Sequence, residues 1–232
     1  MRHPEPAHPS PCGADAPCAG PGPPPRTVDV TVTTPAGTSK SGAADRFTYS
    51  SPSPPSSFSD GPSGFWARGA ILDLVSAGVI TGYPDGTFRP ESDVTRAEFV
   101  KMLVLALGIP SSQAKPPFAD VPADAWYARS LTAAYAAGIV SGISPSLFAP
   151  GATITREEMA VILARALKLS GSGPISYADA KAISSWARSG VQATVAAGYM
   201  QGFPNGTFEP LGVATRAQVA SILDRILRTL AP

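Results

Sequence analysis

Histidine and cysteine are almost missing from this sequence of 232 residues, which contains two of each. All four lie near the amino terminus, as His3, His8, Cys12 and Cys18. The rest of the chain therefore has no Ser-His-Asp or Cys-His pair for nucleophilic catalysis, and no histidine or cysteine that could bind a metal ion. The spacing of Cys12 and Cys18 leaves open a disulfide or a metal pair within the N-terminal segment.

Other signatures of catalysis and membrane insertion are missing as well. The sequence has no glycine-rich phosphate loop and no calcium loop of the EF-hand spacing. It has no apolar run long enough to cross a bilayer, and its formal net charge of +1 creates no field that attracts nucleic acid or an anionic membrane. Sequence alone leaves open a carboxylate pair for glycoside hydrolysis. We predict a protein that is not an enzyme, uses no cofactor or metal, and neither binds nucleic acid nor inserts into a membrane.

Proline and glycine, with 26 and 22 residues, are abundant and unevenly spread. Residues 1–26 form a proline-rich tail that we expect to be disordered and that lacks the apolar core of a signal peptide. Residues 27–50 show the alternation of two short strands, which predicts a β-hairpin, and residues 51–57 form a Ser/Pro linker. Because a lone hairpin is marginal in water, we expect an upstream in-frame segment to encode missing strands and an export signal, so that Met1 is not the true start.

The remainder of the chain is a threefold repeat with a period of 60 residues. Six residue types recur in register. They are Trp66, Trp126 and Trp186; Gly82, Gly142 and Gly202; Phe88, Phe148 and Phe208; Pro90, Pro150 and Pro210; Thr95, Thr155 and Thr215; and Arg96, Arg156 and Arg216. The register predicts three units at residues 58–110, 116–170 and 174–230. Threefold repetition favours a binding function over a single catalytic centre.

Each unit is predicted to consist of a helix, a loop and a second helix. In the second unit the first helix is expected to begin near Asp120 and Asp124, to include Trp126 and to end at Gly138. The second helices begin with a capping box, in which a threonine bonds a first-turn amide and a Glu or Gln three residues later reaches back. The boxes pair Thr95 with Glu98, Thr155 with Glu158, and Thr215 with Gln218.

The second helices are apolar around much of their circumference, which is typical of helices buried among other elements. An open stack of repeats would need polar capping repeats at its ends, and none follows the third unit. We therefore predict a mainly α fold in which three helix-loop-helix repeats close into a pseudo-threefold arrangement. The three second helices would form a central bundle, and a short β-hairpin would precede them.

An arginine opens each second helix, at positions 96, 156 and 216, although the helix dipole disfavours a cation there by a few tenths to about 1 kcal/mol. Two interpretations remain open. Each arginine could join the free amides of the helix start in holding an anionic ligand. Alternatively, each could pair inside the protein, for example with Asp60, Asp120 or Asp179.

The repeated tryptophans and glycines also have two interpretations. An indole ring most often fills a core, but its flat face also suits stacking on a sugar ring. The glycines precede or belong to segments such as Pro-Asp-Gly and Pro-Asn-Gly, which predict tight turns. The second unit, with the loop SGISPSLF, lacks the second glycine, so a groove that uses its loop is expected to bind most weakly.

Residues 58 to about 230 resemble the S-layer homology family. The shared features are Phe-x-Asp, a tryptophan, the loop T-G-Y-x-D-G-T-F-x-P, and T-R-A-E before an apolar helix; the third unit has T-R-A-Q, and the second has T-R-E-E with an altered loop. The resemblance implies a three-pronged pseudo-trimer around a central three-helix bundle. It also implies a non-catalytic anchor that binds secondary cell-wall polysaccharide, often through a pyruvylated sugar, in grooves between the prongs. Residues 27–49 resemble the end of an immunoglobulin-like TIG module.

The family's groove residues transfer to this sequence by position. The implied ligand-binding residues are Arg96, Arg156, Arg216, Asp60, Asp120, Asp179, Trp66, Trp126, Trp186, Gly82, Gly142 and Gly202. We accordingly expect a cell-surface protein of the cell wall whose partner is an anionic glycan. Two alternatives remain: a helical repeat that binds proteins, including its own kind in a surface lattice, and the anchor fragment of a larger surface enzyme.

Overall fold

The computed structural model describes residues 58–61, 64–171 and 173–230, together with four short strands nearer the amino terminus. Strand β1 (Arg26–Asp29) pairs with β4 (Arg46–Tyr49) in an antiparallel ladder that places Val28 opposite Phe47. Between them, β2 (Thr33–Thr34) pairs with β3 (Gly37–Thr38). This pairing matches the hairpin predicted for residues 27–50. The predictions for residues 1–25 and for the linker at 51–57 lie outside the described residues.

The described part of the three units contains six α-helices joined by loops, and its fold is mainly α as predicted. They are α1 (Arg68–Ser76), α2 (Arg96–Ala106), α3 (Ala128–Ala136), α4 (Arg156–Ala166), α5 (Arg188–Ala196) and α6 (Arg216–Leu230). A 3-10 turn, η2 (Ala180–Ala182), precedes α5. None of the helices in these residues has both the length and the apolar character to cross a bilayer.

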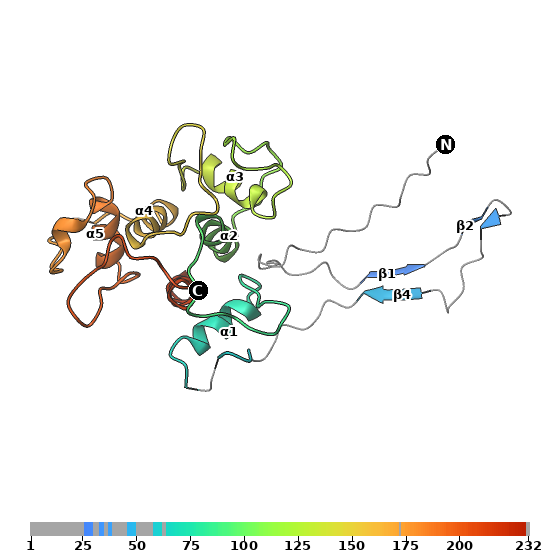
Figure 1. Ribbon diagram of the computed structural model, residues 1–232, viewed down its shortest axis with the longest axis horizontal. Coiled ribbons are helices and arrows are strands. Elements are labelled where there is room, and N and C mark those ends of the chain that lie inside the picture. Colours follow the sequence, from blue (N-terminus) through green and yellow to red (C-terminus); the bar gives the residue numbers. More distant parts are fainter. Residues whose placement is uncertain are drawn as a thin grey trace.

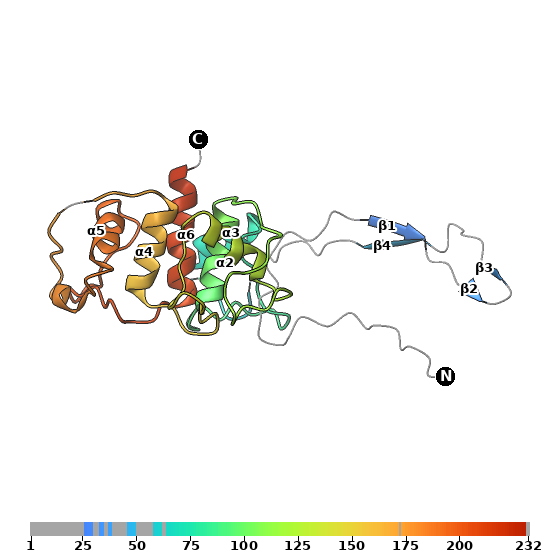
Figure 2. The ribbon, with the colours of Figure 1, turned by 90° about the horizontal axis from the view of Figure 1, so that it is seen from above.

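The second helices of the units form the centre of the molecule. Figure 1 shows α2, α4 and α6 grouped at the middle with α1, α3 and α5 around them, and Figure 2 shows the central helices running side by side. Each central helix packs against the first helix of the next unit, so that α2 contacts α3, α4 contacts α5, and α6 returns to contact α1. The contact between α6 and α1 closes the ring, which confirms the closed arrangement and rules out the open stack.

Three backbone hydrogen bonds join the units in a cycle just before the central helices. The Val94 amide donates to the Ala214 carbonyl at 3.0 Å, the Ala214 amide to the Ile154 carbonyl at 3.2 Å, and the Ile154 amide to the Val94 carbonyl at 2.9 Å. All three residues are fully buried. Because each unit both donates and accepts once, the cycle is complete only when all three units are present.

The capping boxes form as predicted. The Thr95 amide donates to Glu98 Oε2 at 2.8 Å while the Glu98 amide donates to Thr95 Oγ1 at 3.2 Å, and Thr155 with Glu158 repeats this exchange. In the third unit the Thr215 and Gln218 bonds are both 3.4 Å long. A neutral amide replaces a carboxylate there, so the charge-assisted part of the cap is missing.

The start of the first helices differs from the prediction. Helix α3 begins at Ala128 rather than near Asp120 and Asp124, and Trp126 precedes it in a turn instead of lying inside it. The physical reason is that the Asp120 carboxylate is used elsewhere, by the backbone amides of Phe148 and Ala149. The predicted end is correct, since Gly138 follows the helix with a φ of +70°, a conformation that favours glycine.

Candidate functional site

The three helix-start arginines are buried, with exposed fractions of 5% for Arg96 and Arg156 and 2% for Arg216. Each donates its Nε to the carbonyl of the repeated phenylalanine in the next unit. The donor-to-oxygen distances are 3.0 Å from Arg96 to Phe148, 2.7 Å from Arg156 to Phe208, and 3.0 Å from Arg216 to Phe88. Each guanidinium also lies over the ring of the same phenylalanine, with Cζ 4.7 to 4.9 Å from the ring centre. The arginines are therefore contacts between units.

The remaining guanidinium nitrogens find different partners in the three units. Arg96 Nη1 bonds Glu158 Oε1 at 2.7 Å. Arg156 Nη2 donates to the Gln201 carbonyl at 2.8 Å, and Arg156 forms no ion pair with any residue that the structure describes. Arg216 Nη1 lies 3.8 Å from the nearest Glu98 oxygen and makes no hydrogen bond within the described residues. Where an acidic partner is present, it is the capping-box glutamate of the next unit, not one of the aspartates named above.

The amides of the helix starts are not free to hold an anion, contrary to the first interpretation. The Arg96 and Ala97 amides donate to the Ala152 and Pro150 carbonyls of the next unit at 2.8 and 3.1 Å. The other two central helices make the same bonds to Gly212 and Pro210, and to Ser92 and Pro90. Backbone carbonyls thus satisfy the donors that a helix start leaves open.

The repeated aspartates hold the loops of their own units. Asp120 accepts hydrogen bonds from the amides of Phe148 and Ala149. The backbone φ of Ala149 is +58°, a value that residues other than glycine rarely adopt. Asp60 and Asp179 make the equivalent bonds, to Phe88 and Arg89 and to Phe208 and Glu209. Partial burial acts to raise the pKa of Asp120, but the two amides and the Arg96 charge outweigh it, so that this pKa is lowered overall. The same balance, with Arg156 as the cation, lowers the pKa of Asp179.

The repeated glycines provide room for an aromatic ring. A Cβ at Gly82 would overlap the edge of the Phe58 ring and lie 2.8 Å from the Thr87 carbonyl oxygen. Gly202 meets Tyr177 in the same way, and Gly142 meets Phe118. These contacts give the glycines a packing role. The tight turns predicted nearby are present, with φ values of +78° at Gly86 and +80° at Gly206.

The three tryptophans are exposed, with accessible fractions of 63% for Trp66, 39% for Trp126 and 56% for Trp186. The core-filling interpretation is therefore wrong for all of them. Each sits in the turn two residues before a first helix. A large apolar side chain held at the surface in three equivalent places is a candidate contact for a partner.

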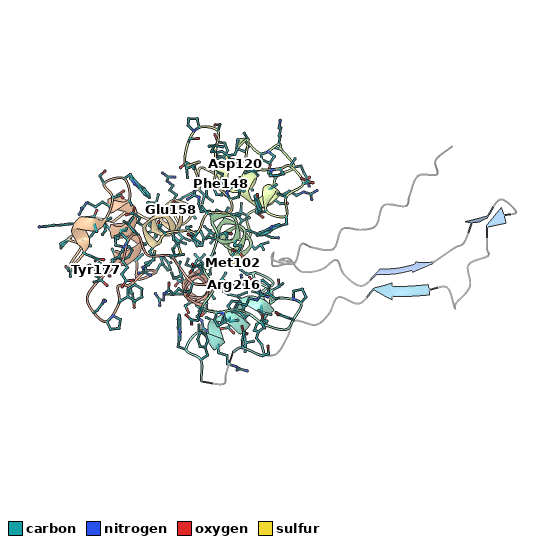
Figure 3. The ribbon with its side chains drawn as sticks, viewed as in Figure 1. Met102, Asp120, Phe148, Glu158, Tyr177 and Arg216 are labelled. Carbon is teal, nitrogen blue, oxygen red and sulfur yellow. The ribbon has the colours of Figure 1, made fainter. Side chains whose placement is uncertain are left out.

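One groove brings residues of all three units together. Its polar lining consists of Thr81, Glu98, Lys101 and Arg216, and its apolar lining consists of Ile80, Met102 and Trp126. Figure 3 shows Met102 of α2 and Arg216 of α6 close to one another near the centre of the ring. We call this the Trp126 groove.

The electrostatics of the groove favour an anion. Burial lowers the pKa of Arg216, against the opposing effect of Tyr83 and Glu98, which is the signature of a cation removed from water. Lys101 is only 9% exposed, and its Nζ donates to the Trp126 carbonyl at 3.3 Å and lies 4.8 Å from the centre of the Trp126 ring. Two buried cations and one carboxylate thus line the same groove as the exposed indole.

The sequence prediction did not include Lys101, because lysine does not recur at this position in the other two units. The equivalent positions one and two periods later are Val161 and Ser221, so the position carries no threefold signal. The one indication available in the sequence was a lysine within an otherwise apolar stretch of helix, FVKMLVLA, where a charged side chain is costly to bury without a partner.

The three units match a known domain family. The S-layer homology domain family matches residues 57–100, 117–160 and 176–220. An amylopullulanase of Thermoanaerobacterium thermosulfurigenes and the exoglucanase XynX of Acetivibrio thermocellus are each 38% identical over 168 residues, which is 70% of this chain but 9% and 15% of those proteins. The surface-layer 125 kDa protein of Lysinibacillus sphaericus is 36% identical over 169 residues, or 71% of this chain and 14% of that protein.

The chain therefore spans only a small part of the length of these relatives. S-layer homology domains are non-catalytic anchors that attach surface proteins to the cell wall and bind its secondary polymers, and proteins that carry them are found at the cell surface or in the cell wall. The three matches coincide with the three units of the closed ring. This chain belongs to the S-layer homology family, with three tandem copies of its domain.

Proposed function

We propose that residues 58–230 act as a non-catalytic anchor that binds a secondary cell-wall polysaccharide, through a pyruvylated acidic sugar, in the grooves between units. The observation that carries the proposal is the Trp126 groove. There, Arg216 Nη1 is buried without a hydrogen-bond partner among the described residues, and it lines the same groove as Lys101 and the exposed indole of Trp126. A ketal carboxylate would supply the missing acceptor, while the sugar ring would lie against the indole.

The twelve residues that the family implies divide into two roles under this proposal. The arginines and tryptophans contact the glycan. The aspartates and glycines do not contact the glycan but shape the loop beside it. The aspartates hold the loop backbone, and the glycines let the loop pack on an aromatic ring. These residues are Asp60, Asp120 and Asp179, and Gly82, Gly142 and Gly202. An error in the loop would shift the edge of the groove.

The protein served by this anchor is also part of the proposal. The amylopullulanase and the exoglucanase match this chain over about 170 residues and are much longer proteins. We propose that the chain, too, attaches a larger surface protein to the wall.

Sedimentation with purified wall sacculi tests the anchor. The chain should pellet with intact sacculi and remain in solution once the non-peptidoglycan polymer has been extracted. A soluble pyruvylated disaccharide should compete for binding, and the same disaccharide without the pyruvate ketal should not. Sedimentation of the chain without any wall material would instead favour self-assembly into a lattice, and equal pelleting after extraction would exclude the polymer as partner.

A further inference from the structure

The Trp126 groove has two counterparts by the register of the repeat, and the residues at the three equivalent places carry different charges. The residues that correspond to Lys101 are Val161 and Ser221, and those that correspond to Glu98 are Glu158 and Gln218. By the same register, Trp126 and Arg216 correspond to Trp186 and Arg96 in the second groove and to Trp66 and Arg156 in the third. We name each groove by its tryptophan.

In the Trp186 groove the cation, Arg96, is already paired with a carboxylate of the protein. Arg96 Nη1 is bonded to Glu158 Oε1 at 2.7 Å, with the arginine side chain 6% exposed. A ligand carboxylate there would have to replace a short charge-assisted bond already made inside the protein. The position of Lys101 is taken by Val161, which packs closely against Gly190 of α5 and adds no charge.

The Trp66 groove has one cation, Arg156. Burial lowers the pKa of Arg156, and the carboxylate of Glu209 acts in the opposite direction. Arg156 donates to two backbone carbonyls, those of Phe208 and Gln201. Its neighbour in the capping box is the neutral Gln218. The groove therefore has one cation rather than two, with Ser221 at the lysine position.

Only the Trp126 groove combines two cations. Arg216 Nη1 and Glu98 form an ion pair, but their separation of 3.8 Å is too long for a hydrogen bond, and Lys101 adds an ammonium group beside the indole. Since both cations are at least nine-tenths buried, their attraction for an anion is screened less than that of surface charges.

We propose that the Trp126 groove is the principal site for the acidic sugar, that Lys101 determines this preference, and that the Trp186 groove is the weakest of the three. The inference rests on the proposed function, because it assumes an anionic glycan. It names a residue and an order of affinity that the threefold motif does not contain, since the position of Lys101 lies outside the repeated residues of that motif.

The three tryptophans allow each groove to be followed separately. In the full chain labelled with ¹⁵N, the three indole N–H signals, assigned with single Trp→Phe variants, would be recorded during titration with a pyruvylated disaccharide. The Trp126 signal should saturate at the lowest concentration, Trp66 next and Trp186 last. The disaccharide without the pyruvate ketal should remove the differences.

Two substitutions test the role of Lys101. Lys101→Val copies the second unit and should raise the Kd at Trp126 by about tenfold, the low end of what loss of a charge-assisted hydrogen bond costs. Lys115→Val, at an exposed loop position, is the matched control and should leave all three affinities unchanged. Ser221→Lys places an ammonium group in the Trp66 groove and should tighten binding there, which keeps the test valid if Lys101→Val disturbs folding.

The outcomes separate the two proposals. Equal affinities in all three grooves, unaffected by Lys101→Val and Ser221→Lys, would overturn the inference and leave the anchor function intact. If no indole signal moves with the disaccharide while the chain still pellets with sacculi, the pyruvylated sugar is wrong as the ligand and the inference falls with it.

Discussion

Arg96 and Phe148 are joined twice across the boundary between the first and second units. The Nε of Arg96 donates to the Phe148 carbonyl at 3.0 Å, and its Cζ lies 4.7 Å from the centre of the Phe148 ring. The amide of Phe148 donates to Asp120 at 2.9 Å. Both backbone groups of one residue are therefore held by charged side chains, one from each unit, and the other two boundaries repeat the arrangement.

The first prediction follows from this contact. Replacing Arg96 with alanine should lower the free energy of unfolding by about 3 kcal/mol, because it removes a buried ion pair and a charge-assisted bond to a carbonyl. Urea unfolding measures the change. Arg129→Ala, at an exposed position of α3, should stay within about 0.5 kcal/mol of the parent. An equally small change for Arg96→Ala would mean that the contact adds nothing to stability.

The second prediction concerns acid. Because the pKa values of Asp120 and Asp179 are lower in the folded protein than the ordinary value of 3.8, the unfolded chain binds more protons below about pH 4. The stability that these carboxylates add is present above the unfolded pKa and is lost as the pH falls through the folded values.

Replacement by asparagine should reveal this contribution. The double variant Asp120→Asn and Asp179→Asn should be less stable than the parent at pH 7 and should lose less stability between pH 4 and pH 2. Urea unfolding across this range measures both effects. Asp124→Asn, at an exposed position, controls for the loss of a negative charge. Parallel curves for the parent and the double variant would contradict the assignment.

The third prediction concerns the glycines beside the aromatic rings. Gly82→Ala should destabilise the protein by about 1–3 kcal/mol, since the added methyl group meets both the Phe58 ring and a backbone carbonyl. Gly151→Ala is the matched control, because a Cβ there meets nothing within 4 Å. Thermal melting of the two variants compares them directly. Similar midpoints would show that the loop moves aside at little cost.

The fourth prediction uses a difference between units at the end of the central helices. Gly108 follows α2 with a φ of +61°, and Lys168 follows α4 at the equivalent position with a φ of +51°. Lys168→Gly should therefore stabilise the protein, by up to about 1 kcal/mol, by relieving a left-handed conformation. The gain is limited because glycine also loosens the unfolded chain. Gly108→Lys should have the opposite sign, and a loss of stability in Lys168→Gly would contradict the argument.

The fifth prediction concerns ring closure. Removal of residues 1–57 should leave the melting midpoint nearly unchanged, since the cycle of Val94, Ile154 and Ala214 and the contact of α6 with α1 lie entirely within the remaining residues. Removal of residues 174–232 should give insoluble or unfolded protein, because it opens that cycle and uncovers the apolar faces of α1, α2 and α4. Circular dichroism and size-exclusion chromatography distinguish these results. A soluble, cooperatively folding two-unit fragment would show that closure is dispensable.

The sequence by itself determined the period, the central helices and the closed architecture. Tryptophan, glycine and arginine recurring every 60 residues defined the units, and the Thr-x-x-Glu signals located the central helices to the residue, because a capping box is a local interaction within four residues. The apolar character of those helices was enough to predict that they meet at the centre.

Only the tertiary structure decided what the repeated polar residues contact. Arg96 reaches a carbonyl 52 positions away and Arg216 one 128 positions away, and no local pattern specifies such a partner. In the folded protein the aspartates bind loop amides instead of capping the first helices, so α3 begins later than predicted. The tryptophans are exposed at the surface. The role proposed for Lys101 depends on three units meeting at one groove, so a comparison of equivalent positions along the chain does not reveal it. Local interactions determine where a helix begins. The charge of a site that several units form depends on which side chains the tertiary structure brings together.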